Sequence, residues 1–186
     1  MRFVPTCRGA ARFAIVVAAA CASAVCATSV SAAQIAQVDR PAPELDVRLL
    51  SGKLLKAKEL RGKVVVNVIW ATWSPAARME LPDVQRLYRE YHDKGLEVVA
   101  LSIDESPAEV REFWRKRDYS FPVAMRSDAF FDHYGRVSTT PMFYIVDRQG
   151  TLRYRVAGPV GSEKLEALLK PLIAERAPGA SVAKKY

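Results

Sequence analysis

Residues 64–75 read VVVNVIWATWSP. The first seven are β-branched or aromatic except for Asn67, which is the composition of a strand buried on both faces. Serine is a preferred N-cap residue and proline a preferred first residue of a helix, so Ser74 and Pro75 indicate a helix start. The sequence therefore predicts a buried strand over Val64–Trp70, a tight turn and a helix. Asn67 is a polar residue in this strand and needs hydrogen-bond partners.

The chain around this unit alternates between strand-like and helix-like segments. Apolar residues spaced i, i+3, i+4 and i+7 predict a helix over residues 75–94, which Gly95 would end. Pro82 inside it and Pro171 near the C-terminus are expected to kink or end their helices. The other expected strands are 96–103, 121–124, 142–146 and 151–156, the other expected helices are 104–116, 129–134 and 163–173, and a hairpin is expected over 45–55.

The order of these elements predicts the fold class. Strands separated by helices favour parallel pairing with right-handed crossovers, and a closing hairpin adds antiparallel strands. We expect an α/β domain over residues 45–175, with a mixed central sheet flanked by helices in three layers. Residues 34–44 contain two prolines and no clear period, so they are interpreted as a linker. Residues 176–186 are expected to be a flexible tail.

Residues 1–33 have the composition of a secretory signal peptide. A start with three arginines and no acid precedes the almost wholly apolar stretch 13–25, and Ser31-Ala32-Ala33 supplies the small residues of a cleavage site. We therefore expect export, cleavage near Ala33, and a periplasmic protein without stable membrane insertion. A membrane anchor is the alternative, although the apolar run is short and rich in alanine. A lipid-bearing Cys21 or Cys26 is disfavoured, because neither has a leucine three residues before it.

Cleavage would change the charge and the thiol content of the chain. The formal charge would fall from +8 to +5, because three arginines leave. All three cysteines precede residue 34, so the mature chain would have no thiol and no disulfide. The basic residues do not form a stripe with interleaved aromatics, so the sequence does not favour nucleic-acid binding. Two histidines without cysteine favour no metal site, and no phosphate loop or nucleotide fingerprint predicts a cofactor.

Ser74 can be interpreted in two ways. As an N-cap it needs only local chemistry. As a nucleophile it would need a base within reach, and only His92 and His133 exist. His92 lies about 27 Å further along the predicted helix at about 1.5 Å per residue, and nothing in the sequence directs His133 toward Ser74. The sequence favours the capping role, and an aspartate at this position is expected to cap equally well.

The motif Trp70-Ala71-Thr72-Trp73, followed by Pro75, Arg78, Glu80 and Pro82, resembles the thioredoxin-like domains of TlpA and ResA. These are redoxin-type envelope thiol–disulfide oxidoreductases, and the resemblance covers roughly residues 43–173. It implies that Ser74 and Ala77 occupy the positions of the two catalytic cysteines. The segment Thr139–Asp147 is similar to the family's segment with a cis-proline before a strand, which implies a cis bond before Pro141, beside the turn.

These observations favour a thioredoxin-like scaffold without dithiol chemistry. We expect a binding groove between Trp73-Ser74-Pro75 and Thr140-Pro141 that takes an envelope protein or peptide client, whereas Trp70 belongs to the core. The alternative is a thiol–disulfide oxidoreductase of the TlpA/ResA type, either by descent or as an active enzyme in which both cysteines have been replaced. A third interpretation is a structural subunit that no longer uses the groove.

Overall fold

The computed structural model describes residues 34–175, so the predicted signal peptide (1–33) and tail (176–186) lie outside the described residues. The strands are β1 (Gln34–Pro41), β2 (Val47–Arg48), β3 (Leu54–Leu55), β4 (Val64–Trp70), β5 (Leu96–Ser102), β6 (Val123–Met125), β7 (Met142–Val146) and β8 (Thr151–Ala157). The α-helices are α1 (Pro75–Tyr91), α2 (Pro107–Arg117), α3 (Asp128–Tyr134) and α4 (Ser162–Ala174), and short 3₁₀ helices are η1 (Ala57–Leu60) and η2 (His92–Lys94).

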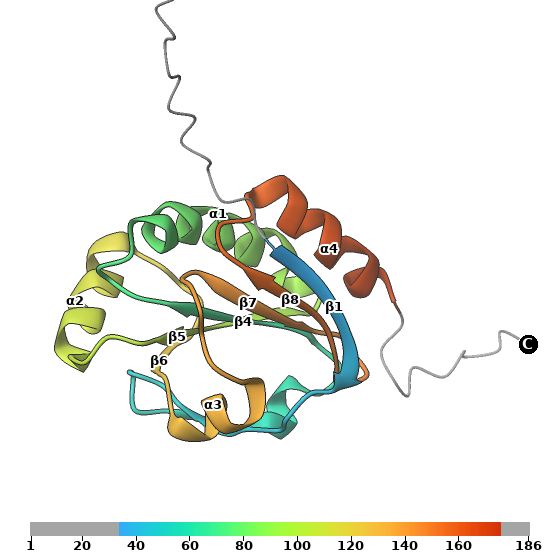
Figure 1. The fold of residues 1–186 in the computed structure, drawn as a ribbon, viewed down its shortest axis with the longest axis horizontal. Coiled ribbons are helices and arrows are strands. Elements are labelled where there is room, and N and C mark those ends of the chain that lie inside the picture. The colour runs from blue at the N-terminus through green and yellow to red at the C-terminus, as the bar shows by residue number, and fades with distance from the viewer. Residues whose placement is uncertain (1–33, 176–186) are drawn as a thin grey trace, which may run out of the picture. The chain divides into compact units, whose positions relative to one another are not determined.

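Six strands form one mixed sheet in the order β1-β8-β7-β4-β5-β6 (Figure 1). β4, β5 and β6 are parallel, whereas β7 runs antiparallel to β4 and β8 runs antiparallel to both β7 and β1. β4 lies at the centre and is buried along its whole length, as its composition predicts. The expected α/β fold with a mixed central sheet is therefore confirmed.

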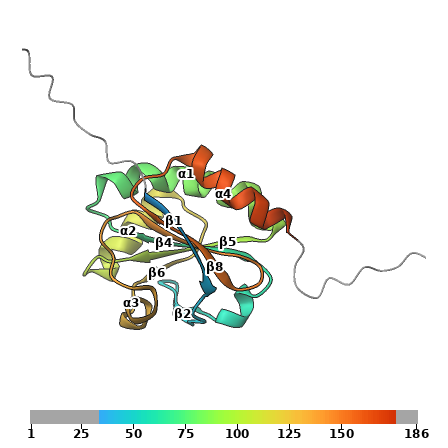
Figure 2. The ribbon, with the colours of Figure 1, turned by 45° about the vertical axis from the view of Figure 1, so that its right-hand side comes forward.

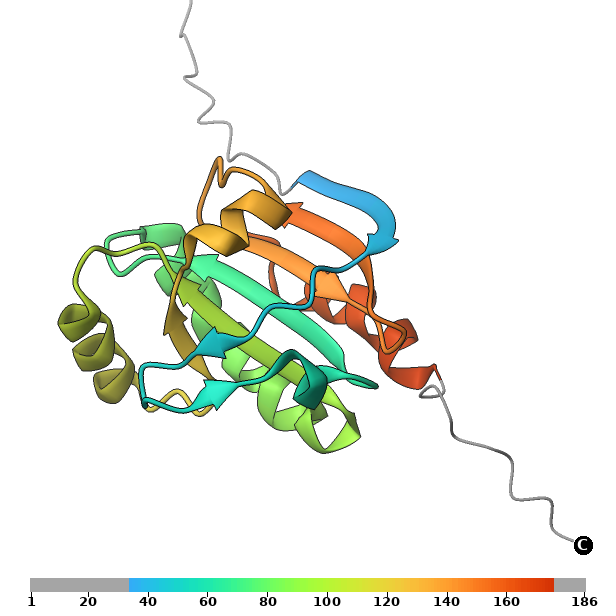
Figure 3. The same cartoon turned by 90° about the horizontal axis from the view of Figure 1, so that it is seen from below.

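The helices cover the two faces of the sheet unequally. α1 and α4 pack on one face, and α3 with the β2–β3 hairpin covers the other (Figures 2 and 3). Side chains of β4 alternate between the two layers: Val64, Val66, Val68 and Trp70 join one core cluster, and Val65 and Ile69 join the second. The chain passes from β4 to β5 through α1 and from β5 to β6 through α2, and both steps go in the same direction along the sheet. Right-handed crossovers then place α1 and α2 on the same face, and both contribute to the first core cluster.

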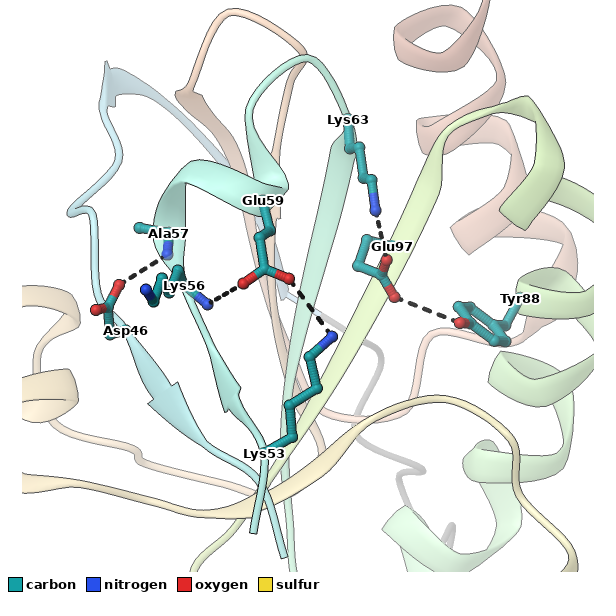
Figure 4. A network of polar contacts seen from close by, with 8 residues as sticks. All are labelled: Asp46, Lys53, Lys56, Ala57, Glu59, Lys63, Tyr88 and Glu97. Atoms are coloured by element: carbon teal, nitrogen blue, oxygen red, sulfur yellow. Dashed lines mark hydrogen bonds and ion pairs between the residues drawn. The ribbon is translucent and has the colours of Figure 1, made fainter. Parts of the chain in front are cut away.

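Polar contacts hold the β2–β3 hairpin and the start of β4 in place (Figure 4). The Asp46 carboxylate accepts a hydrogen bond from the Ala57 N–H at 2.8 Å. Lys63, just before β4, forms a 2.9 Å ion pair with Glu97 of β5. Glu97 also accepts from the Tyr88 hydroxyl of α1 at 3.4 Å, and burial followed by this carboxylate raises the pKa of Tyr88 to about 12.

The linker prediction for residues 34–44 is wrong over its first eight residues. Gln34–Pro41 forms the edge strand β1, paired with β8 and interrupted by a bulge between Gln37 and Arg40. Asp39 in the bulge forms a 2.9 Å ion pair with Arg153 of β8. Almost every β1 side chain is exposed, so backbone pairing rather than apolar burial holds this strand. A strand stabilised in this way has no alternating hydrophobic pattern for sequence analysis to detect.

Two helix boundaries also differ from the expected ones. α2 begins at Pro107 rather than at residue 104, because Ser106 caps it by accepting from the Glu109 N–H. Pro171 does not end its helix, since α4 continues to Ala174. Gly95, with a φ of 94°, closes η2 as expected.

Candidate functional site

The N-terminus of α1 is organised by Ser74. Its hydroxyl accepts a hydrogen bond from the Ala77 N–H at 3.3 Å, and Pro75 occupies the first helical turn. The Ser74 carbonyl accepts from the Arg78 N–H at 3.0 Å, which begins the helical ladder. The predicted N-cap is therefore confirmed. Ser74 is buried at 4% exposure and Ala77 is fully buried, so the cap is enclosed by protein.

The Ser74 hydroxyl makes a second contact across the molecule. It donates to the carbonyl oxygen of Thr140 at 3.3 Å, which joins the start of α1 to the residue before β7. The Thr140–Pro141 peptide bond is cis. The Pro141 carbonyl in turn accepts from the Gly158 N–H at 2.9 Å, so the segment after β8 is bonded to the same corner. The structure thus brings together Ser74, Thr140 and Pro141, as the predicted groove requires.

Asp104 holds the turn that precedes Ser74. Its carboxylate accepts from the Thr72 N–H at 3.0 and 3.1 Å and from the Thr72 hydroxyl at 2.6 Å. The Ser102 hydroxyl donates to the same carboxylate at 2.6 Å. Asp104 is only 8% exposed, so these bonds compensate a buried carboxylate. The turn therefore has a defined geometry without any contribution from a thiol.

Glu80 supports the site from one turn further along α1. Its carboxylate accepts from the backbone N–H groups of Val160 and Gly161 at 3.2 and 2.8 Å, where α4 begins. Gly161 is the N-cap of α4 and supplies no side-chain cap, so Glu80 performs this capping from another helix. Burial raises the pKa of Glu80, and the two backbone hydrogen bonds oppose that rise.

Two large apolar side chains near the turn are open to solvent. Trp73 is 64% exposed and Met79 is 79% exposed, and the charged Arg78 beside Met79 is exposed as well. Trp70, by contrast, is fully buried against Phe113 and Trp114. The expected division between a core and a rim tryptophan is confirmed. Trp73 offers a large contact area beside Pro75, which is itself exposed.

The arrangement does not support a nucleophilic Ser74. Within residues 34–175, its hydroxyl has the Ala77 N–H and the Thr140 carbonyl as partners and no histidine. The His92 ring contacts the Leu96 carbonyl instead, and His133 lies on α3. The same part of the chain contains no cluster of three or more metal-ligating side chains. What the site offers is a helix N-terminus, a fixed turn and an exposed tryptophan.

The family model described as Redoxin matches residues 37–169, which is most of the chain. This chain belongs to the redoxin family. It is 33% identical over 137 residues to the thiol-disulfide oxidoreductase ResA of Bacillus anthracis, covering 73% of this redoxin and 79% of that protein. It is 32% identical over 136 residues to the thioredoxin-like protein YneN of Bacillus subtilis, covering 72% and 79%.

Solved structures share the fold of this redoxin. A secreted thiol-disulfide isomerase from Corynebacterium glutamicum superposes with a TM-score of 0.70 at 19% identity, covering 76% of this chain and 92% of that one. A putative thiol:disulfide interchange protein DsbE from Chlorobium tepidum superposes with a TM-score of 0.67 at 24% identity, covering 76% and 100%. The resemblance to TlpA and ResA is therefore confirmed at the level of family and fold. No helix in residues 34–175 of the redoxin is long and apolar enough to cross a membrane.

Two residues that organise the site received no role in the sequence analysis. Asp104 was assigned to the start of a helix, although it follows β5 at the edge of the sheet where β4 also ends. Because parallel neighbours present their carboxyl ends together, an acidic residue there was a detectable signal. Glu80 was recognised within the motif, but its partners at 160 and 161 are set by where α4 docks.

Proposed function

We propose that this redoxin is an exported protein that binds an extended segment of a client protein in the groove between Trp73-Ser74-Pro75 and Thr140-Pro141, without thiol–disulfide exchange of its own. The observation that carries the proposal is that the strand, turn and helix start are arranged as a thioredoxin-like site, but this site contains no cysteine. The turn, the helix cap and the Thr140 contact are all built, yet an oxygen stands at 74 and a methyl group at 77. The proposal rests on the implication of the resemblance to TlpA and ResA that the family has its two catalytic cysteines at these positions.

The chemistry of the two side chains supports this interpretation. Thiol–disulfide exchange needs a thiolate to attack and a second thiol to resolve the mixed disulfide. A serine hydroxyl retains the capping hydrogen bond but has no comparable thiolate form, and Ala77 has no heteroatom. All three cysteines precede residue 34, so cleavage near Ala33 would remove every thiol. Binding is the function that this surface retains.

Trp73 is the residue on which client binding depends most in this proposal. An exposed aromatic side chain beside a rigid turn supplies apolar contact at low entropic cost. The probe is fluorescein-labelled insulin B chain with its cysteines alkylated, and its anisotropy measures binding. Trp73→Ala is expected to weaken binding about tenfold, the size of a typical interface hot spot. The matched control is Ile35→Ala, another exposed apolar residue but on β1, which should bind like the native chain. Equal binding by native and Trp73→Ala chains would exclude this groove.

The second candidate is a thiol–disulfide oxidoreductase, which the names of the relatives favour. Reduction of insulin disulfides by the purified chain separates the two. The client-binding proposal expects no turnover by the native protein, either as residues 1–186 or after removal of residues 1–33. Turnover that survives removal of residues 1–33 would establish the oxidoreductase and exclude the proposal.

A further inference from the structure

A cavity of about 560 Å³ lies on the face of the sheet that α3 and the β2–β3 hairpin cover. It is lined by residues of β4 and β7, by Phe130 and Tyr134 of α3, by η1 and by residues 41–47. None of Trp73, Ser74, Thr140 or Pro141 lines it. The cavity is therefore distinct from the groove of the proposed function, and its volume falls in the range of small-molecule sites.

Asn67 is the polar residue of the cavity floor. Strand alternation places it on the same face of β4 as Val65 and Ile69, toward α3. It is 9% exposed and makes no side-chain hydrogen bond within residues 34–175, yet its amide is not among the fully buried polar atoms that lack a partner, so these atoms are open to the cavity that Asn67 lines. The other six residues of β4 are Val, Ile or Trp. An amide that faces a cavity and has no protein partner is available to hydrogen-bond to a molecule in that cavity.

Most charged groups around the cavity have protein partners, although the Nε atom of Arg148 is buried without one. Arg61 and Glu44 at its rim form a 2.9 Å ion pair with each other. The Arg148 guanidinium donates to three backbone carbonyls, and Asp147 accepts from the Gln149 and Thr151 N–H groups. Burial raises the pKa of Tyr134 to about 12, so this phenol stays neutral. Glu44, Arg61 and Asp147 each pair with an opposite charge, and Arg148 is held by the three carbonyls, so we expect a neutral ligand rather than an ionic one.

We infer that the cavity binds a small, neutral, mostly apolar molecule that carries a carbonyl or carboxamide group, and that this group hydrogen-bonds to the Asn67 side chain. The apolar lining takes the body of the molecule. The amide supplies both a donor and an acceptor at the floor, which fits a carbonyl or carboxamide better than a hydrocarbon. The inference does not depend on client binding at Trp73.

The test uses two dyes that differ only in a carbonyl group. The probe is prodan, which is 6-propionyl-2-(dimethylamino)naphthalene, and 6-propyl-2-(dimethylamino)naphthalene has a methylene group in place of the ketone. Fluorescence titration of the full chain is expected to show saturable binding of prodan. Asn67→Leu should weaken prodan binding about fivefold, the size of one net hydrogen bond, and leave the ketone-free dye within about twofold. Leucine has the same number and branching of side-chain heavy atoms as asparagine, and the ketone-free dye controls for its somewhat larger volume.

Gln85→Leu is the matched control. Gln85 is also a buried amide, but it is fully paired with Ser120 and does not line the cavity, so this variant should bind both dyes like the native chain. A second measurement needs no variant. Asn67 is the single asparagine of the chain, so ¹⁵N-asparagine labelling gives one side-chain amide pair in the NMR spectrum. Prodan should shift that pair. Absence of saturable binding, equal prodan binding by Asn67→Leu and native chains, or an unmoved amide pair at saturation would each overturn the inference.

Discussion

Ser74 combines a local and a long-range hydrogen bond in one hydroxyl, and Ser106 allows the two to be separated. Both serines cap a helix that continues with proline, but within residues 34–175 only Ser74 also donates to another segment. We expect Ser106→Ala to cost about 1 kcal/mol, the loss of a cap, and Ser74→Ala to cost about 2 kcal/mol, because the Thr140 carbonyl loses its donor as well. Urea unfolding of the two variants measures the difference. Equal losses would show that the Thr140 contact contributes nothing to stability.

The same contact revises the expectation for aspartate at position 74. A carboxylate can cap the helix, but it cannot donate to the Thr140 carbonyl, and two acceptors would face each other there. Ser74→Asp should therefore be destabilising by about 1 kcal/mol or more, whereas Ser106→Asp should be neutral. A comparison of the unfolding midpoints at neutral pH checks this. An unchanged midpoint for Ser74→Asp would support a purely local cap.

Glycine is required at position 95 both by the left-handed backbone and by the close approach of Arg148. Gly52 shares the backbone conformation but not the contact, so it serves as a comparison. Both have a left-handed φ near 90°, but a Cβ at Gly95 would lie 2.6 Å from Arg148, whereas a Cβ at Gly52 meets nothing within 4 Å. Arg148 is held by the carbonyls of Gly62, Lys94 and Ile173, so it cannot easily withdraw. We expect Gly52→Ala to cost about 1 kcal/mol from backbone strain alone, and Gly95→Ala to cost at least about 2 kcal/mol. Thermal or urea unfolding of the pair tests the contribution of the contact.

At the scale of elements, α1 and α4 are joined by the carboxylate of Glu166. It accepts from the Tyr91 hydroxyl at 2.7 Å and pairs with Lys170 at 2.8 Å and with Arg86 at 3.5 Å. The hydrogen bond from Lys170, followed by that from Tyr91, lowers the pKa of Glu166 to about 2. A carboxylate whose pKa is lowered on folding stabilises the folded state above its ordinary pKa of 4.5, and this contribution is lost as the pH falls toward 2.

Glu166→Gln should therefore unfold at a lower urea concentration than the native chain at pH 7. The gap between the two should close between about pH 4.5 and pH 2, because the native carboxylate becomes protonated in that range. Glu105→Gln is the control, since this exposed carboxylate has no ion pair in the described part of the chain. A gap that persists unchanged at pH 2 would mean that charge at Glu166 does not stabilise the α1–α4 contact.

At the scale of the whole molecule, we expect the redoxin fold to support thiol–disulfide exchange once cysteines are introduced at the turn. A helix N-terminus lowers the pKa of a thiol, so Ser74→Cys places a reactive thiolate at the cap, and Ala77→Cys adds a resolving thiol one turn later. We expect the double variant of residues 34–186 to reduce insulin disulfides, and Ala77→Cys alone to be inactive. If the folded double variant does not reduce insulin disulfides, the groove can no longer support thiol–disulfide exchange. That result would favour a structural role.

The composition of residues 64–70 was sufficient to predict the buried strand, and the capped start of α1 could be predicted because its hydrogen bonds join residues at most four positions apart. The alternation of strands and helices likewise determined a mixed sheet, since parallel neighbours need crossovers. Only tertiary structure decided which distant groups meet. Ser74 reaches Thr140 across 66 positions, and Glu80 reaches residues 160 and 161. β1 joins the sheet through backbone bonds that leave no side-chain pattern, and Asn67 faces a cavity because α3, η1 and β7 close around it. Such contacts depend on where whole elements dock, and no local preference encodes that.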